Sequence, residues 1–314
     1  MSGHIVALSG GVGGAKLAHG LAQVLAPEDL TIIVNTGDDF RHLGLAVSPD
    51  LDSVVYALAG LEDTARGWGR RDESWRFMAA LEQLGGETWF QLGDLDLAMH
   101  VERSARLAAG ETLSGFTDRI RRRLAIGARI LPMSDDPVRT RVLTAEGWLD
   151  FQDYFVRRHC EPAVQAIEFA GAAAARPHPD ALAALARADL RAIVICPSNP
   201  FVSIEPILAL PALRAALAAA RAPRVAITPI IGGRAVKGPA AKMLRELGFE
   251  AGGAAVARRY AGLVDTFISD AADPLPTVPP GMRVLALPTL MSTPSDRARL
   301  ARALLEQAVG RPER

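Results

Sequence analysis

The chain has 314 residues, 49% of them hydrophobic, and its 35 basic residues balance 35 acidic ones, which argues against nucleic-acid binding. Two distant cysteines, Cys160 and Cys196, argue against a disulfide scaffold and suit a reducing cytoplasm. Because the sequence opens directly on a strand and no apolar run reaches membrane-spanning length, we predict a cytoplasmic protein without a membrane partner. This length predicts one large α/β domain, residues 1–314, with an insertion.

The N-terminal stretch predicts a strand, a glycine loop and a helix. Residues 4–8 are apolar, residues 9–14 read SGGVGG, and residues 15–25 repeat leucine and valine at helical spacing. Bare backbone N–H groups at a helix N-terminus suit phosphate, so this loop is a candidate nucleotide site. Its candidate residues are Gly10, Gly11, Gly13, Gly14 and Lys16. Neither the P-loop nor the Gly-x-Gly-x-x-Gly fingerprint fits, because a required glycine is missing near Lys16.

Acidic residues follow the second predicted strand, residues 30–35. Asp38 and Asp39 come at its carboxyl end, the edge where open α/β sheets bind ligands. Asp50 is expected to be the N-cap of the next helix, so that Asp52 lies in the first turn of that helix. His42, in the loop between these pairs, is a candidate to face the ligand.

Residues from about 62 to 127 predict a mostly helical insertion that covers the active edge of the sheet. Helical segments are expected at 74–84, 100–109 and 117–124. The arginines between residues 119 and 123 indicate a solvated helix face, with phosphate contact as the alternative.

After the insertion, strands and helices alternate. We expect a strand at 128–133, a hairpin from 138–143 and 148–151, an edge strand at 164–169, and helices at 154–159 and 179–188. Further strands are expected at 192–196, 224–228, 266–269 and 284–287, and further helices at 240–247 and 294–309. This alternation predicts a doubly wound, mainly parallel α/β sheet of Rossmann-like type.

Other strand ends carry small, polar and cationic residues. The candidates for holding a nucleotide diphosphate there are Ser198, Asn199, Gly232, Gly233 and Lys237. Hard oxygen ligands of the kind that Mg²⁺ takes beside phosphates are offered by Asp38, Asp39, Asp50, Asp52, Asp135 and Asp136. This mixture favours phosphoryl-type transfer. Gly-x-Ser-x-Gly and His-Glu-x-x-His do not occur in the sequence, so a hydrolase elbow and a zinc site are unsupported.

In order, and over nearly the whole chain, the motifs resemble those of the 2-phospho-L-lactate transferase family of coenzyme F420 biosynthesis. They are SGGVGGAK (9–16), VNTGDD (34–39), SPDLD (48–52), LGD followed by Asp96 (92–96), ILPMSDDPV (130–138), FQD (151–153), PSNP (197–200) and PIIGG (229–233).

The resemblance implies a donor in which guanosine diphosphate is esterified to a three-carbon acid such as lactate or enolpyruvate. The acceptor would be the deazaflavin Fo, whose terminal ribityl hydroxyl attacks the phosphorus that bears the acid and releases GMP. Mg²⁺ would assist, and the family's usual form is a homodimer. The resemblance implies that residues 10–14, 198–199 and 232–238 hold the guanosine diphosphate. The resemblance also implies that Asp52 and Gln91 contact the acceptor. From its place in the loop, His42 is a further candidate to contact substrate, and Asp39 and Asp52 are the candidates to bind the metal and act in catalysis.

Two other functions stay open. A non-catalytic relative that binds a uridine diphosphate sugar and regulates cell-wall metabolism would need the glycine loop but not the acceptor site, and residues 48–52 and 134–137 favour the transferase. An NAD-dependent oxidoreductase is opposed by the incomplete glycine fingerprint. Neither the strand order nor the acid of the donor follows from the residues.

Overall fold

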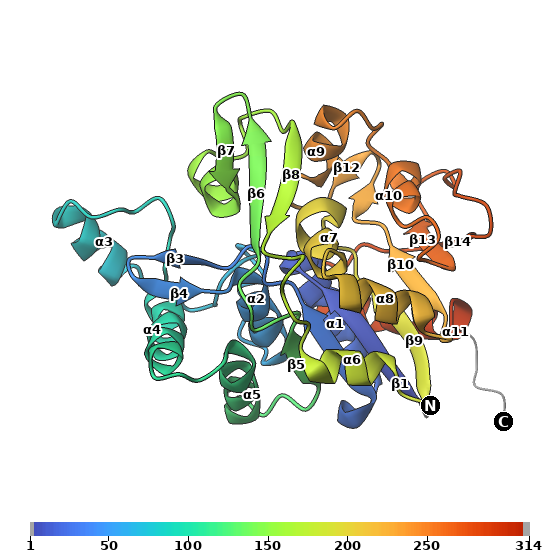
Figure 1. Ribbon diagram of the computed structural model, residues 1–314, viewed down its shortest axis with the longest axis horizontal. Coiled ribbons are helices and arrows are strands. Elements are labelled where there is room, and N and C mark those ends of the chain that lie inside the picture. Colours follow the sequence, from blue (N-terminus) through green and yellow to red (C-terminus); the bar gives the residue numbers. More distant parts are fainter. Residues whose placement is uncertain (1–2, 310–314) are drawn as a thin grey trace.

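The computed structural model describes residues 3–309, and its centre is a seven-stranded sheet in the order β14-β13-β10-β9-β1-β2-β5 (Figure 1). In chain order the strands are β1 (His4–Ser9), β2 (Leu30–Val34), β5 (Arg129–Pro132), β9 (Leu190–Ile195), β10 (Arg224–Ile227), β13 (Thr266–Asp270) and β14 (Arg283–Leu287). Every neighbouring pair is parallel. The predicted doubly wound, Rossmann-like fold is therefore confirmed, and the strand order reverses between β1 and β9.

Helices cover both faces of this sheet. Alternate residues of β1 face opposite sides, so that Val6 and Leu8 belong to one apolar core and Ile5 and Ala7 to the other. The first core is covered by α6 (Pro179–Leu185), α7 (Glu205–Leu208), α8 (Pro211–Ala219), α9 (Ala240–Glu246) and α10 (Gly253–Arg259). The second core is covered by α1 (Gly11–Val24), α2 (Pro49–Leu58) and α11 (Pro294–Gln307). Inner strands such as β1, β2 and β13 are buried on both faces, as their apolar runs predict, whereas the edge strand β14 is partly exposed.

Additional elements interrupt the α/β rhythm. Between β2 and β5 the chain forms β3 (Phe40–His42), β4 (Leu45–Val47), α3 (Arg76–Gln83), α4 (Asp94–Ala108) and α5 (Leu113–Arg123), on the left of Figure 1. A separate antiparallel sheet, at the top of that view, consists of β6 (Arg139–Thr144), β7 (Gly147–Asp150) and β8 (Ala166–Ala170). The hairpin of β11 (Ile230–Ile231) and β12 (Arg234–Ala235) follows β10, and short helical turns span Pro27–Asp29, Asp153–Arg157 and Pro200–Ile204.

Three local predictions need correction. The first helix begins at Gly11 rather than after the glycines, so these residues form its first turn. Asp50 is not the N-cap of α2, because the helix begins at Pro49, two residues earlier than predicted, and Ser48 takes the cap position. Helix α4 begins at Asp94, six residues before the predicted start, because the sequence reading followed apolar spacing and missed its acidic first turn.

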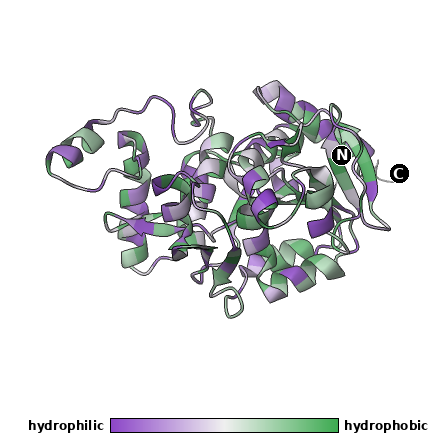
Figure 2. Ribbon diagram, turned by 90° about the horizontal axis from the view of Figure 1, so that it is seen from above, coloured by the Kyte–Doolittle hydropathy of each residue, from purple (hydrophilic) through white to green (hydrophobic). Residues whose placement is uncertain are grey.

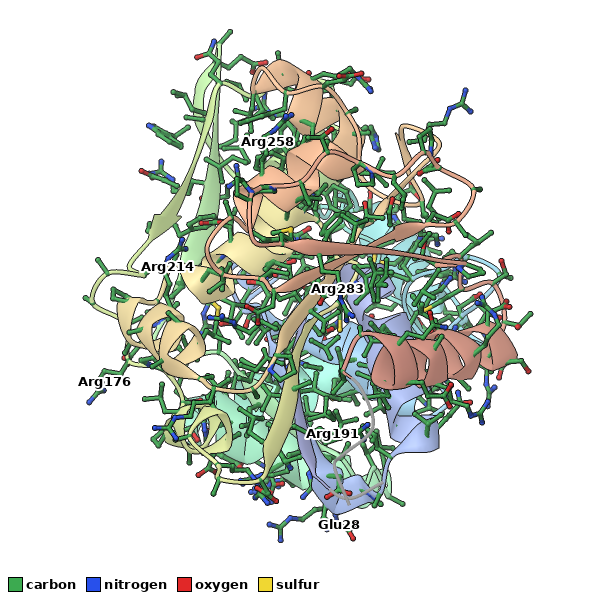
Figure 3. All side chains as sticks on the ribbon, turned by 90° about the vertical axis from the view of Figure 1, so that its right-hand side faces the viewer. Glu28, Arg176, Arg191, Arg214, Arg258 and Arg283 are labelled. Carbon is green, nitrogen blue, oxygen red and sulfur yellow. The ribbon has the colours of Figure 1, made fainter. Side chains whose placement is uncertain are left out.

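The surface combines polar and apolar residues. Figure 2 shows helices that carry both hydrophobic and hydrophilic residues, and in Figure 3 the side chain of Arg176 points outward. The predicted arginine face of α5 is paired, with Arg119 contacting Glu111 and both Arg121 and Arg122 contacting Asp118. Within residues 3–309 no single helix is long and apolar enough to cross a membrane. The helices Pro200–Leu208 and Pro211–Ala219, which are bent by 85° relative to each other, reach that length and apolar composition only when they are counted together.

Candidate functional site

A cavity of about 640 Å³ lies where the strand order reverses. Its walls include the β1–α1 turn and the segments that follow β9, β10 and β14, represented by Gly10, Pro197, Pro229 and Leu290. Ligands of doubly wound sheets bind in the crevice at this position, outside the carboxyl ends of the strands. A volume in this range accommodates a small-molecule ligand. This cavity is therefore the candidate functional site.

The glycines at the start of α1 allow an unusually close packing of the backbone. Gly10 has extended dihedral angles, and a Cβ atom there would lie 2.7 Å from Asp50 Oδ2 and 2.7 Å from Ser203 Cβ. A Cβ atom on Gly13 would overlap the carbonyl oxygen of Pro197. Gly11 has a φ of +61°, a left-handed conformation that favours glycine. Gly10, Gly11 and Gly13 line the cavity, whereas Gly14 is buried behind them against Ser9 and Ser198.

The carboxyl group of Asp50 caps helix α1 instead of its own helix. Its Oδ1 accepts the Gly11 N–H at 2.6 Å, and its Oδ2 accepts the Asn35 side-chain amide at 2.9 Å. The same amide donates to Asp38 Oδ1 at 2.9 Å, so one asparagine bridges two carboxyl groups of the cavity wall. Burial raises the pKa of Asp50 to about 6 and that of Asp38 well above its usual range. An anion bound at this turn would therefore have to use the later N–H groups of α1.

Two lysines supply positive charge to the cavity. Lys16 donates from Nζ to the carbonyl of Met291 at 2.9 Å, and Lys237 donates to the carbonyl of Gly67 at 3.0 Å. Within the described part of the chain neither lysine forms an ion pair. Burial lowers the pKa of Lys16, and the nearby charges of Arg297 and Lys237 lower it further. A diphosphate group would provide the counter-charge that these two ammonium groups lack.

Asp52 is the centre of a buried polar network on another wall. Its Oδ1 accepts a hydrogen bond from Arg103, its Oδ2 has no hydrogen-bond partner, and His100 Nδ1 lies 3.7 Å from that Oδ2. His100 Nε2 lies 3.4 Å from Asp96 Oδ2, and the Tyr56 hydroxyl donates to Asp96 Oδ1 at 2.5 Å. Burial raises the pKa of Asp52, and the charge of Arg103 opposes that shift. The prediction that Asp52 lies in the first turn of its helix is confirmed.

Two predicted residues lie behind the cavity wall instead of on it. Asp39 is buried, accepts the Ser48 hydroxyl at 2.8 Å through Oδ2, and leaves Oδ1 without a partner. Burial raises the pKa of Asp39 to about 8. His42 is also buried, with its ring 5.0 Å from that of Trp89, and burial lowers its pKa. His42 therefore supports an aromatic wall and does not itself line the cavity.

That aromatic wall consists of five side chains from three segments of the chain. Trp68, Trp89, Phe90, Phe151 and Phe155 line the cavity, and the rings of the last two stack 5.3 Å apart with an angle of 6° between their planes. Gln91 lines the same side and donates to the Thr88 carbonyl at 2.7 Å. A flat apolar ring system would complement such a surface.

The remaining candidates divide between the cavity and the periphery. Ser198 and Asn199 line the cavity, and the Ser198 hydroxyl donates to the Gly10 carbonyl at 2.7 Å. Lys237 lines it too, whereas Gly232 and Gly233 form the turn of the β11–β12 hairpin with φ values of +59° and +69°. Asp135 and Asp136 lie outside the lining, where they bind Ser114 and Arg176.

Sequence reasoning did not identify the aromatic residues of the lining as site residues, nor the polar lining residues Tyr56, Asp96 and His100. Asp96 and His100 are four residues apart and so share a face of α4, a signal that the late predicted start of this helix concealed.

The carboxylates present suit a divalent cation. Among the described residues, Asp39 Oδ1 and Asp52 Oδ2 are the buried carboxylate oxygens without a hydrogen-bond partner. Mg²⁺ binds through one or two carboxylates together with substrate phosphates, and of these two residues Asp52 lines the cavity, whereas Asp39 lies behind its wall. Asp52, Asp96 and His100 also bring ligand atoms within 4.8 Å of one another, but that set contains an imidazole, which suits transition metals better than Mg²⁺.

Comparison with known proteins identifies the family. Residues 5–278 match the family model of 2-phospho-L-lactate transferase CofD. The chain is 45% identical to a phosphoenolpyruvate transferase of Kitasatospora aureofaciens, over 96% of this chain and 98% of that one. It is 41% identical to a protein of the same name from Thermobifida fusca, over 99% of both chains. A Bacillus halodurans structure of the UPF0052 family shares the fold, with a TM-score of 0.62 over 98% of this chain and 100% of that chain at 16% identity. The chain therefore belongs to the 2-phospho-L-lactate transferase CofD family.

Proposed function

We propose that the protein transfers a phosphoenolpyruvyl group from a guanosine-diphosphate donor to the terminal ribityl hydroxyl of the deazaflavin Fo, releasing GMP and forming dehydro-F420-0. One observation carries this proposal: a single cavity joins two unpaired lysines, an unpartnered carboxylate oxygen on Asp52 and an aromatic wall. Relatives up to 45% identical are named phosphoenolpyruvate transferases, which favours enolpyruvate over lactate as the acid carried by the donor.

The donor diphosphate would bind at the lysine end. Lys16 and Lys237 offer two positive charges, and the N–H groups of α1 beyond Gly11 remain available at the positive end of the helix dipole. Ser198 and Asn199 line the same end. Fixed cations of this kind stabilise the charge that develops on a transferring phosphoryl group.

The acceptor ring would bind against the aromatic wall. Its flat ring system would pack on Trp89 and on the stacked pair Phe151 and Phe155, with its ribityl chain directed toward Asp52. Gln91 would contact the same ring through its side-chain amide.

The transfer step joins these two ends. The ribityl oxygen forms a bond to the phosphorus that bears enolpyruvate, and the bond from that phosphorus to the GMP oxygen breaks. Asp52 Oδ2 accepts the hydroxyl hydrogen and so orients the attacking oxygen, and the proton passes from Asp52 to solvent. Asp52 on the cavity wall, together with Asp39 behind it, would hold Mg²⁺, which when bound would neutralise charge on the phosphates.

Mass spectrometry of the products tests the proposal. The protein is incubated with Fo, Mg²⁺ and either the enolpyruvyl or the lactyl donor, and we expect a product heavier than Fo that forms in greater yield with the enolpyruvyl donor and is two hydrogens lighter than the lactyl product. Asp52→Asn should lose most but not all of the activity, whereas Asp180→Asn, whose carboxylate pairs with Arg129 at the surface, should keep it. Light scattering of the same sample tests the proposed homodimer. An unchanged Fo, together with tight binding of a uridine diphosphate sugar, would instead support the regulatory alternative.

A further inference from the structure

Arg103 is a buried charged residue that contacts three other elements, α2, β4 and α5. Its side chain is 2% exposed, and from α4 it donates to Asp52 Oδ1 on α2 and to the Ala46 carbonyl on β4 at 3.2 Å. Its guanidinium group lies 5.4 Å from the centre of the Phe116 ring on α5. Burying a guanidinium group is costly unless it is paired and hydrogen-bonded, so the fold stabilises this cation at one defined position.

The hydrogen bonds of Arg103 also select one tautomer of the neighbouring His100. Arg103 Nη1 lies 3.3 Å from His100 Nδ1, and because a guanidinium group only donates, Nδ1 is the accepting nitrogen. The ring proton is then on Nε2, which faces Asp96 Oδ2 at 3.4 Å. In this tautomer His100 does not donate to Asp52. The free oxygen of Asp52 therefore stays free, although an imidazole lies beside it.

We propose that Arg103 is a positioning residue for the transfer, which holds Oδ1 of Asp52 so that Oδ2 is the single oxygen presented to the substrate. The inference rests on the proposed function, in which Asp52 Oδ2 orients the attacking hydroxyl. It assigns a task to the inserted helix α4: a residue that does not line the cavity fixes the orientation of one that does. A misplacement of about 1 Å at a reacting group can lower the rate about 100-fold.

The alternative is that the ion pair only stabilises the fold. Arg103→Met and Arg103→Lys are compared with Arg106→Met, a control on the next turn of α4 whose partner Glu102 is at the surface. We expect kcat to fall about 100-fold in Arg103→Met and less in Arg103→Lys, while the KM for the donor stays near the wild-type value. Arg106→Met should behave as the wild type. Should Arg103→Met fail to fold, the lysine variant carries the same test, since it keeps the charge but not the forked geometry.

A double-variant comparison separates the two roles. In an Asp52→Asn background, removal of Arg103 should lower kcat no further, because a positioning residue acts only through the group that it positions. Two results would overturn the positioning role and leave the proposed function intact. In the first, the double variant loses kcat by the product of the two single-variant factors. In the second, the wild type is active and both Arg103 variants keep its kcat. A wild-type protein that transfers nothing to Fo would overturn both.

Discussion

From the close approach of Gly10 to its neighbours we predict how much an alanine at this position destabilises the fold. Gly10 and Gly252 are both helix N-cap residues with extended backbones, so alanine is conformationally acceptable at each. A Cβ atom at Gly10 would lie 2.7 Å from Asp50 Oδ2 and 2.8 Å from the Ser203 carbonyl oxygen, whereas at Gly252 it would have no neighbour within 4 Å among the described residues. Any loss of capping quality affects both variants alike. The difference between them therefore measures the overpacking alone, about 1–3 kcal/mol.

Urea unfolding of Gly10→Ala and Gly252→Ala measures this difference. We expect Gly10→Ala to lower the free energy of unfolding relative to Gly252→Ala, with similar dependence on urea concentration, because only the contacts in the folded state change. Gly10→Ala should also weaken nucleotide binding, since Asp50 must move away from the Gly11 N–H. Two variants within about 0.5 kcal/mol of each other would refute the reasoning, because surface substitutions scatter by that amount.

Three further predictions concern charge and shape in the cavity. Burial raises the pKa of Asp39 to about 8, so in the metal-free protein its contribution to the free energy of unfolding should fall as pH rises from about 4 to 8. Asp39→Asn should therefore flatten the dependence of that free energy on pH, measured by urea unfolding in the presence of a chelator. An unchanged dependence on pH would contradict the buried, protonated state of Asp39. Lys16→Met and Lys237→Met should each weaken donor binding about tenfold, as measured by calorimetry. Lys242→Met is the control, because Lys242 pairs with Glu246, and it should leave donor affinity unchanged. Equal losses of affinity in all three variants would refute a specific role of Lys16 and Lys237. Trp89→Leu should raise the KM for Fo without changing donor affinity, and a change in donor affinity would place the ring elsewhere.

The sheet could be predicted because its inner strands are buried on both faces. Runs such as residues 30–34, which read LTIIV, are mostly apolar and β-branched, a pattern that local sequence reveals without knowledge of the neighbours. The β3–β4 hairpin was not expected, because its turn depends on positive φ values at Leu43 and Gly44, and leucine seldom adopts one. The order of the strands depends on long-range packing, and no local sequence pattern predicts it.

The candidate site was only partly predictable for a related reason. Glycines after a strand indicate a tight turn, but whether they bind a ligand or let Asp50 approach depends on a helix about forty residues later. His100 and Arg103 are ordinary helix residues in the sequence, and only the fold brings them beside Asp52. Local patterns therefore located the cavity, whereas the pairing of its buried charges required the structure.

The central claim is the transfer itself, and GMP release tests it most directly. The protein is mixed with the enolpyruvyl guanosine-diphosphate donor and Mg²⁺, with and without Fo, and GMP is followed by chromatography. We predict release that requires Fo, in equal amounts to the Fo consumed. Release that is independent of Fo, or no release while the donor binds tightly, would contradict the account.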